Sequence, residues 1–347
     1  MFLKNCWYVA AWDREVTDKP MARTICNEPV VLYRKQDGTP AALEDRCGHR
    51  NLPLSMGKVV GDNLQCGYHG VEFDCTGKCA KIPGQTNTPS RAQIRSYPVV
   101  EKWNWIWIWM GDPARVDHSL FPDWWWVDHP EWAFARPDML PVKADYRLFN
   151  DNLLDVTHLQ YVHTGSIGAD SITEFPIECE VEDRKVTMRR WIRDREPPPT
   201  YRKAGGFKGN VDRCQLAEYY PPCFTANHAA VFDVEDKVQD FNRGFRVNAL
   251  SAPTPETETS CHYFFGFVRA FLTDDKEFEE KFTAEFVRVF KEDVAILEAQ
   301  QRSNDRFGDA PGFDIKVDAA PKAARRMLEK MIAEEQTEAA AAKVAAE

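Results

Sequence analysis

Hydrophobic and aromatic residues occur in short runs along the first third of the chain. Residues 7–12, 30–34 and 97–101 are such runs, and turn signals such as Asp37-Gly38 separate them. Short apolar runs bounded by Gly, Pro and Asp are typical of β-strands. The pattern therefore predicts an all-β region over residues 1–113.

Four tryptophans near the end of this region follow a period of two: Trp103, Trp105, Trp107 and Trp109. In a strand, this period places side chains on one face of the sheet. We interpret the indoles as core packing rather than a base-stacking surface, because no basic side chains interleave with them.

The remainder of the chain changes character. A stretch rich in Pro, Asp and His over residues 111–130 is expected to hold a domain boundary. Helical and strand-like patterns then mix, with helices over residues 142–160 and 275–302 and strands over residues 177–193 and 245–271. This mixture predicts an α+β fold. We place the domains at residues 1–118 and 119–347.

Two further segments of the second domain are distinctive. Residues 201–213 contain three glycines and several basic residues, and we interpret them as a mobile surface loop. Residues 337–347 are rich in Ala, which predicts a frayed helix or a disordered tail.

Composition and charge narrow the function. The chain has 347 residues, of which 44% are hydrophobic and 28% are charged, as in ordinary globular proteins. Its net charge of −10 argues against a dedicated nucleic-acid binder. Charged residues interrupt the first fifteen positions, and no apolar run approaches the ~20 residues of a membrane span. We therefore expect a cytoplasmic protein without a membrane or nucleic-acid partner, whose ten cysteines serve as thiols or metal ligands.

Four Cys and His residues form two similar motifs in the all-β region. Cys47-Gly48-His49 is followed, after sixteen residues, by Cys66-Gly67-Tyr68-His69. Two thiolates and two imidazoles suit tetrahedral zinc or a Rieske [2Fe-2S] cluster. Zinc modules usually pair two Cys in the first motif, whereas here each motif supplies one Cys and one His. We therefore predict a Rieske cluster bound by Cys47, His49, Cys66 and His69, and interpret Cys75 and Cys79 as ordinary thiols.

A second concentration of metal-binding residue types lies at positions 150–163. Spacings of three and four place Asp151, Asp155 and His158 on one helical face. His163 is five residues beyond His158, about 140° around an ideal helix. Both imidazoles can reach one metal only if the helix ends or widens near residues 160–162.

Non-haem Fe(II) oxygenases bind iron with a facial triad of two His and one carboxylate. His158 and His163 supply the two imidazoles, so the carboxylate is expected from elsewhere in the chain. Asp293 lies in the late helix with apolar neighbours on its own face, where a carboxylate requires a partner. Glu292 has half-polar surroundings, which suit an ordinary exposed acid. We therefore predict an iron site formed by His158, His163 and Asp293.

These motifs together resemble the Rieske non-haem iron oxygenases, in particular the group of vanillate, toluenesulfonate and dicamba oxygenase components. The resemblance implies an N-terminal all-β Rieske domain and a catalytic domain of antiparallel sheet and helices. It implies that Asp155 hydrogen-bonds a cluster ligand on one side and His158 on the other, and that Asn152 is the amide beside the iron. It further implies a head-to-tail homotrimer, in which the cluster of one subunit serves the iron of its neighbour.

The same resemblance implies the reaction. The expected activity is hydroxylation by O₂ of a methyl or methoxy carbon of a small aromatic acid, with O-demethylation of a vanillate-like methoxybenzoate favoured. Electrons are expected from a separate flavin or ferredoxin-type reductase that uses NAD(P)H, because the sequence contains no dinucleotide-binding motif: the Gly-rich residues 205–209 lack the G-x-G-x-x-G spacing. Two alternatives stay open, a ring-hydroxylating dioxygenase and a Rieske electron carrier without chemistry of its own.

Candidate substrate-binding residues lie on the strand-like segment of residues 245–271. Arg246, Asn248 and His262 can hold a carboxylate or sulfonate, since Arg pairs with planar anions through two hydrogen bonds. Ser251 stands where the resemblance leads us to expect a substrate-binding His. The alternative for these residues is an exposed or structural role.

Overall fold

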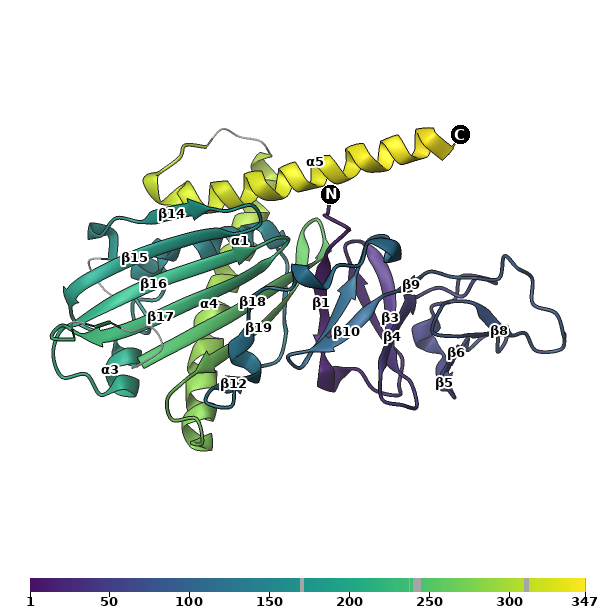
Figure 1. Ribbon diagram of the computed structural model, residues 1–347, viewed down its shortest axis with the longest axis horizontal. Helices are drawn as coiled ribbons and strands as arrows, with labels where there is room; N and C mark the ends of the chain where they lie inside the picture. The colour runs from purple at the N-terminus through teal and green to yellow at the C-terminus, as the bar shows by residue number, and fades with distance from the viewer. Residues whose placement is uncertain (169–171, 237, 240–244, 309–311, 347) are drawn as a thin grey trace. The chain divides into compact units, whose positions relative to one another are not determined.

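The fold is taken from a computed structural model that describes residues 1–168, 172–236, 238–239, 245–308 and 312–346. The described chain forms two compact units (Figure 1). The first contains Met1–Phe121, Thr254–Glu258 and Thr337–Glu347, and the second contains Pro122–Pro253 and Thr259–Gln336.

The first unit consists of short antiparallel strands, as its apolar runs predict. Its sheets have the orders β1-β11-β10, β2-β3-β4-β9 and β5-β6-β7-β8. The strands are β1 Trp7–Trp12, β2 Met21–Ile25, β3 Glu28–Arg34, β4 Pro40–Glu44, β5 Lys58–Val60, β6 Asn63–Gln65, β7 Glu72–Phe73, β8 Cys79–Lys81, β9 Ser96–Tyr97, β10 Val99–Lys102 and β11 Trp105–Trp109.

The alternating tryptophans form part of the core of this unit. Trp105, Trp107 and Trp109 lie in β11 and are at most 1% exposed, and β11 pairs with β1 in the centre of its sheet. Trp103 is buried too, but its φ of 58° places it in the turn between β10 and β11. The prediction of core packing is confirmed, whereas the prediction that all four indoles share one strand face is wrong for Trp103.

One long antiparallel sheet forms the second unit. Its order is β12-β19-β18-β17-β16-β15-β14, and β13 also pairs with β19. The strands are β12 Ala133–Ala135, β13 Leu140–Val142, β14 Glu178–Val181, β15 Val186–Arg195, β16 Val211–Tyr220, β17 Phe224–Asp233, β18 Phe245–Thr257 and β19 Ser260–Arg269.

The helices are α1 Tyr146–Leu154, α2 Leu159–Val162, α3 Pro199–Gly205, α4 Lys276–Phe307 and α5 Ala319–Ala346. Leu154 of α1 and Ala320 and Ala324 at the start of α5 pack with buried residues of β15 and β16. Figure 1 shows α4 crossing behind the strands. Its apolar residues recur every three to four positions, so one face of the helix is buried. Phe290 on that face contacts the rings of Tyr263 and Phe265 in β19, with ring centroids 5.5 and 5.0 Å apart.

Two segments differ from the sequence-based expectation. Residues 201–213 are not a surface loop, because α3 covers the first part and β16 begins at Val211. Tyr201 and Arg213, at the two ends of the segment, are buried. At the C-terminus α5 continues to Ala346, so the helical alternative holds there.

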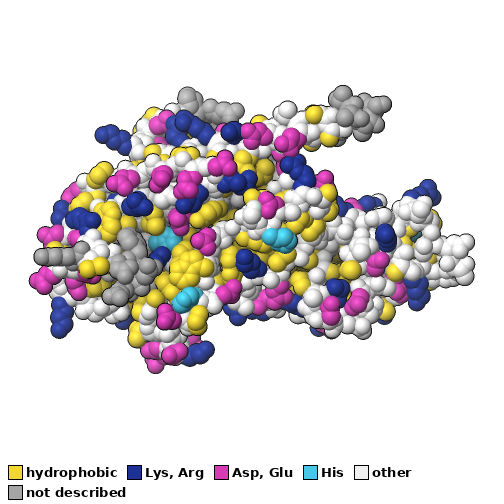
Figure 2. All heavy atoms as spheres, viewed as in Figure 1, with side chains coloured by type: hydrophobic (Ala, Val, Ile, Leu, Met, Phe, Trp, Pro, Cys, Tyr) yellow, Lys and Arg dark blue, Asp and Glu magenta, His cyan; other side chains and the backbone are white. Residues whose placement is uncertain are grey.

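The surface agrees with the overall charge. On the face that Figure 2 shows, acidic and basic side chains are interspersed. Among the helices of the described chain, none combines the length and the apolar character needed to cross a bilayer.

Trp107→Ala is expected to lower the free energy of unfolding by about 3–5 kcal/mol, because it removes a fully buried indole. It also removes the hydrogen bond that Trp107 Nε1 donates to the Lys102 carbonyl at 3.0 Å. Chemical denaturation followed by circular dichroism measures the loss. Val60→Ala, at a side chain 38% exposed, is the control and is expected to change stability by less than about 0.5 kcal/mol. Equal effects of the two variants would contradict this description of the core.

Candidate functional site

The two Cys-His motifs fold into loops of the same design. In each, the Cys amide donates to the carbonyl five residues later, from Cys47 to Leu52 and from Cys66 to Val71, both at 2.8 Å. In each, the amide four residues later donates back to the Cys carbonyl from a residue with positive φ, Asn51 or Gly70. The shared geometry follows from tight turns that need the left-handed conformation at that position.

The loops bring the four predicted cluster residues together. Cys47 and Cys66 are buried, and burial, together with the neighbouring Cys66 thiol, raises the pKa of the Cys47 thiol. The rings of His49 and His69 are exposed, with centroids 4.7 Å apart. Buried sulfurs beside exposed imidazoles suit a cluster with thiolates on one iron and imidazoles on the other.

A glycine is required at position 67 of the second loop. A Cβ on Gly67 would lie 2.8 Å from the backbone oxygen of Met56, closer than real contacts allow. Cys75 and Cys79 pack against the same core at its edge and form no disulfide. Their assignment as ordinary thiols stays a prediction.

The helix that carries His158 and His163 is broken at Asp155. α1 ends at Leu154, and Asp155 adopts φ −106° and ψ 86°, outside the helical region. The Asp155 carboxylate then accepts a hydrogen bond from the Thr157 amide at 2.9 Å and caps a short 3-10 turn, Val156–His158. α2 follows and ends at Val162. The predicted end of the helix near residues 160–162 is confirmed by the end of α2 at Val162. The predicted continuous face of Asp151, Asp155 and His158 is wrong, because the helix also breaks at Asp155.

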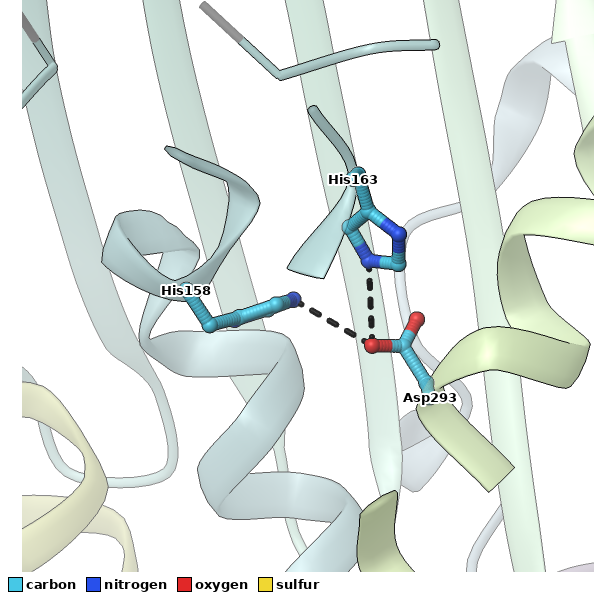
Figure 3. Close-up of side chains that lie close together, drawn as sticks. All are labelled: His158, His163 and Asp293. Atoms are coloured by element: carbon cyan, nitrogen blue, oxygen red, sulfur yellow. Dashed lines mark hydrogen bonds and ion pairs between the residues drawn. The ribbon is translucent and has the colours of Figure 1, made fainter. Parts of the chain in front are cut away.

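The redirected chain brings three predicted ligands to one point (Figure 3). Asp293 Oδ1 lies 3.1 Å from His163 Nε2 and 3.4 Å from His158 Nε2. The three candidate ligand atoms lie within 4.8 Å of one another. Two imidazoles and one carboxylate at this separation can hold one Fe(II) from one side.

The other ring nitrogens are already occupied. His158 Nδ1 contacts the backbone carbonyl of Asp155, and His163 Nδ1 lies 2.8 Å from Glu292 Oε2. A nitrogen that donates to an oxygen fixes the tautomer and leaves the lone pair of Nε2 for a metal. The interpretation of Glu292 as an ordinary exposed acid is therefore wrong, because one of its oxygens holds a candidate ligand. Its position next to Asp293 was the available signal.

The charges in the site stabilise each other. Burial raises the pKa of Asp293, but hydrogen bonds with His158 and His163 outweigh it and lower the pKa to about 2. For His163, burial lowers the pKa, and contacts with Asp293 and Glu292 outweigh it and raise the pKa. The carboxylate is therefore ionised and available as a ligand at neutral pH.

The remaining acids and amides of this region have distinct positions. Asn152 Nδ2 donates to Asp293 Oδ1 at 3.2 Å, beside the candidate ligands. Asp155 contacts His158 through its backbone carbonyl rather than its carboxylate. Asp151 lies away from the site and forms a two-oxygen ion pair with Arg325 Nε, at 2.9 and 2.8 Å.

A largely apolar cavity adjoins the three candidate ligands. It lies between the sheet and α4, and its lining includes Val247 and Ala249 of β18 and Phe286, Val289 and Phe290 of α4. Polar residues in the lining, apart from the candidate ligands, include Arg213 and Gln215 of β16 and Asn227 and His228 of β17. Asn227 Nδ2 donates to the Leu153 carbonyl at 2.7 Å, and the Asn227 Oδ1 atom is buried without a hydrogen bond among the described residues. These polar residues were not predicted from the sequence. The available signal was the alternation of Arg213 and Gln215 with the apolar Cys214 and Leu216 in β16.

The predicted substrate residues lie elsewhere. Arg246, Asn248, Ser251 and His262 are absent from the cavity lining. Arg246 Nε donates to Asn248 Oδ1 at 3.1 Å, and Ser251 Oγ lies 2.9 Å from the Tyr263 hydroxyl. Strand alternation explains the difference for Arg246 and Asn248, because Val247 and Ala249 face the cavity and their neighbours in β18 therefore point to the opposite face. Ser251 shares the face of Val247 and Ala249 but lies outside the cavity lining, in contact with Tyr263.

Comparison with known proteins agrees with these features. Residues 6–98 match the Rieske [2Fe-2S] domain, and residues 142–334 match the vanillate O-demethylase oxygenase C-terminal domain. The chain belongs to the Rieske non-haem iron oxygenases. It is 37% identical to the toluene-4-sulfonate monooxygenase system iron-sulfur subunit of Comamonas testosteroni, over 96% of this chain and 97% of that protein. It is also 37% identical to the vanillate O-demethylase oxygenase subunit of a Pseudomonas species, over 99% of each chain.

A solved structure shows that the likeness extends to the whole fold. The crystal structure of dicamba monooxygenase bound to 3,6-dichlorosalicylic acid has a TM-score of 0.92 and 35% identity, covering 98% of this chain and 99% of that one. The predicted family and the predicted α+β fold with an N-terminal Rieske domain are confirmed. This Rieske oxygenase is an oxidoreductase that uses a [2Fe-2S] cluster and a mononuclear iron.

Asp293→Ala is expected to lower the iron content from about three to about two per chain, with acid-labile sulfide unchanged, because it removes one ligand of the mononuclear site only. Metal and sulfide analysis of the purified protein measures both. Glu280→Ala, at an exposed acid of the same helix, is the control and is expected to keep all the iron. Unchanged iron in Asp293→Ala would contradict the assignment.

Glu292→Ala is expected to weaken retention of the mononuclear iron about 10- to 100-fold, because His163 loses the partner that orients its ring. Competition with a chelator measures the affinity. Glu285→Ala is the matched control, since Glu285 pairs with Arg288, as Glu292 does, but has no contact with His163. Equal losses in the two variants would show that the contact with Arg288, rather than His163, matters.

Proposed function

We propose that this protein is the terminal oxygenase of a multicomponent system that hydroxylates the methyl or methoxy carbon of a small aromatic acid. The observation that carries the proposal is the position of His158, His163 and Asp293 in the wall of a largely apolar cavity. A metal with one face open to such a cavity can act on a ring-bearing ligand placed there. O-demethylation of a vanillate-like methoxybenzoate is the favoured reaction.

The names of the relatives support this substrate class. The similar proteins are named for toluene-4-sulfonate, vanillate and dicamba. In this chain the apolar side chains of α4 and β18 offer the walls for such a ring.

The proposed residues divide the work between two metal groups. Cys47, Cys66, His49 and His69 would hold the [2Fe-2S] cluster, and His158, His163 and Asp293 would hold Fe(II). When bound, the cluster stores one electron at a time and the iron activates O₂. Asn152 and Glu292 fix the Asp293 carboxylate and the His163 ring through the hydrogen bonds described above.

The overall reaction balances with two electrons and two protons. One atom of O₂ enters the C–H bond of the methoxy carbon, and the other leaves as water. The hydroxylated product is a hemiacetal that releases formaldehyde and leaves a phenol. Because the cluster stores a single electron, a separate flavin or ferredoxin-type reductase fed by NAD(P)H must supply electrons in turn.

We further propose that the protein works as a homotrimer in which a cluster serves the iron of a neighbouring subunit. Asp155 is the proposed connection, because its backbone carbonyl contacts His158. Its carboxylate binds only the Thr157 amide among the hydrogen bonds described for it, so one oxygen has capacity for a further donor.

A panel of methoxybenzoates, methylbenzoates and toluenesulfonates, supplied with NADH and a surrogate reductase, tests the proposed activity. We expect formaldehyde and the matching phenol in equal amounts from at least one methoxybenzoate, with one NADH consumed per product. Asp293→Ala is expected to abolish product while leaving reduction of the cluster intact, because only the mononuclear site is lost.

The alternatives predict different results. A cis-diol without formaldehyde would identify a ring-hydroxylating dioxygenase. Cluster reduction without any product, unchanged in Asp293→Ala, would identify an electron carrier.

A further inference from the structure

Arg213 is a buried cation in the wall of the cavity. It lies in β16 opposite Ile192 of β15 and Val231 of β17, and it is 2% exposed. It alternates with Cys214, whose side chain belongs to a cluster with Ala230 and Phe232. The guanidinium therefore belongs to the other face of the sheet, which borders the cavity.

The guanidinium has no partner in the described part of the chain. Its Nε and Nη2 atoms are buried and make no hydrogen bond there. Two other buried arginines of this unit also have unbonded nitrogens, but each donates at least one hydrogen bond: Arg190 to Thr157 Oγ1 at 2.9 Å, and Arg269 to Glu279 at 3.0 Å. An unpaired buried cation costs free energy that a fold normally avoids.

The surroundings of Arg213 do not replace a counter-ion. Burial lowers its pKa and the nearby Tyr201 opposes this, yet a guanidinium stays protonated at neutral pH. The carboxylate in the same cavity wall, Asp293, is already engaged by the two imidazoles and Asn152. Among the described residues that line the cavity, Arg213 thus offers a positive charge with planar donors and no counter-ion, and the candidate iron ligands lie elsewhere in the same lining.

We propose that Arg213 binds the acid group of the aromatic substrate, a carboxylate or a sulfonate, and so selects anionic rings for this cavity. The inference rests on the proposed function, since it names the recognition element of the same site. Guanidinium and carboxylate match in a planar, two-bond geometry, and the pair forms out of water where such bonds are strong. Anchoring the acid group in one part of the lining holds the rest of the ring within the cavity.

The proposal also predicts selectivity against neutral rings. A neutral isostere leaves the guanidinium desolvated and unpaired, and sites built for a polar group reject ligands that lack it. Benzoate and benzamide form a suitable pair of probes, because they have nearly the same shape and differ in charge. Benzenesulfonate and benzenesulfonamide form a second pair that separates carboxylate from sulfonate recognition.

Calorimetric titration of the purified holoprotein with these four probes, without reductase, is the test. We expect the wild type to bind at least one anion about 10- to 100-fold more tightly than its amide, as a charge-assisted pair predicts. Arg213→Gln is expected to lose that preference, with little change in amide affinity. Arg213→Lys is expected to recover part of it, since the charge remains but the two-bond geometry does not.

Arg246→Gln is the matched control, a buried arginine in the same sheet that is absent from the cavity lining. It is expected to keep the anion preference. Equal affinities of the wild type for anion and amide, equal losses of both in Arg213→Gln, or loss of the preference in Arg246→Gln alone would overturn the proposal. Because binding is measured without turnover, the inference can fail while formaldehyde still forms, and it can hold where no product is found.

Discussion

The interruption of the helix between Asp155 and His163 is the constraint on which the site depends. Residues five apart on one continuous α-helix diverge by about 140°, but His158 ends the 3-10 turn that follows Asp155, and His163 lies beyond the end of α2 at Val162. Asp155 leaves the helical region, its carboxylate caps the following turn, and its carbonyl contacts His158. One residue thus ends the first helix, starts the next turn and fixes a ligand ring.

A second constraint is the burial of charge between the sheet and α4. Asp293 is 3% exposed, and its carboxylate is stabilised by contacts with the two imidazoles and the Asn152 amide. Removing any of these partners would leave a buried charge less well compensated. Successive side chains of each strand point to opposite faces of the sheet, so the buried arginines lie on different faces. Arg246 is satisfied by Asn248 on one face, whereas Arg213 on the cavity face has its charge unsatisfied by the described residues.

Local spacing in the sequence was sufficient to predict the cluster loops and the three candidate iron ligands. Cys47, His49, Cys66 and His69 lie in short turns where sequence distance determines spatial distance, and Asp293 was conspicuous among apolar neighbours. The role of Glu292 was not predictable, because its contact with His163 joins segments far apart in the sequence. The break at Asp155 was not predicted either, although the cap that its carboxylate forms with the Thr157 amide is a local contact. The cavity lining was predicted wrongly, since strand register decides which face Arg213 or Arg246 occupies. Trp103 likewise follows the alternation in sequence yet lies in a turn.

The central claim is that one chain provides two separate iron-binding sites, and anomalous diffraction at the iron edge tests it most directly. Crystals of the protein loaded with iron should show one strong peak between the Cys47 and Cys66 loops. A single weaker peak should lie within bonding distance of His158 Nε2, His163 Nε2 and Asp293. No peak within bonding distance of these three ligands, or His158 and His163 bound to different ions, would contradict the account.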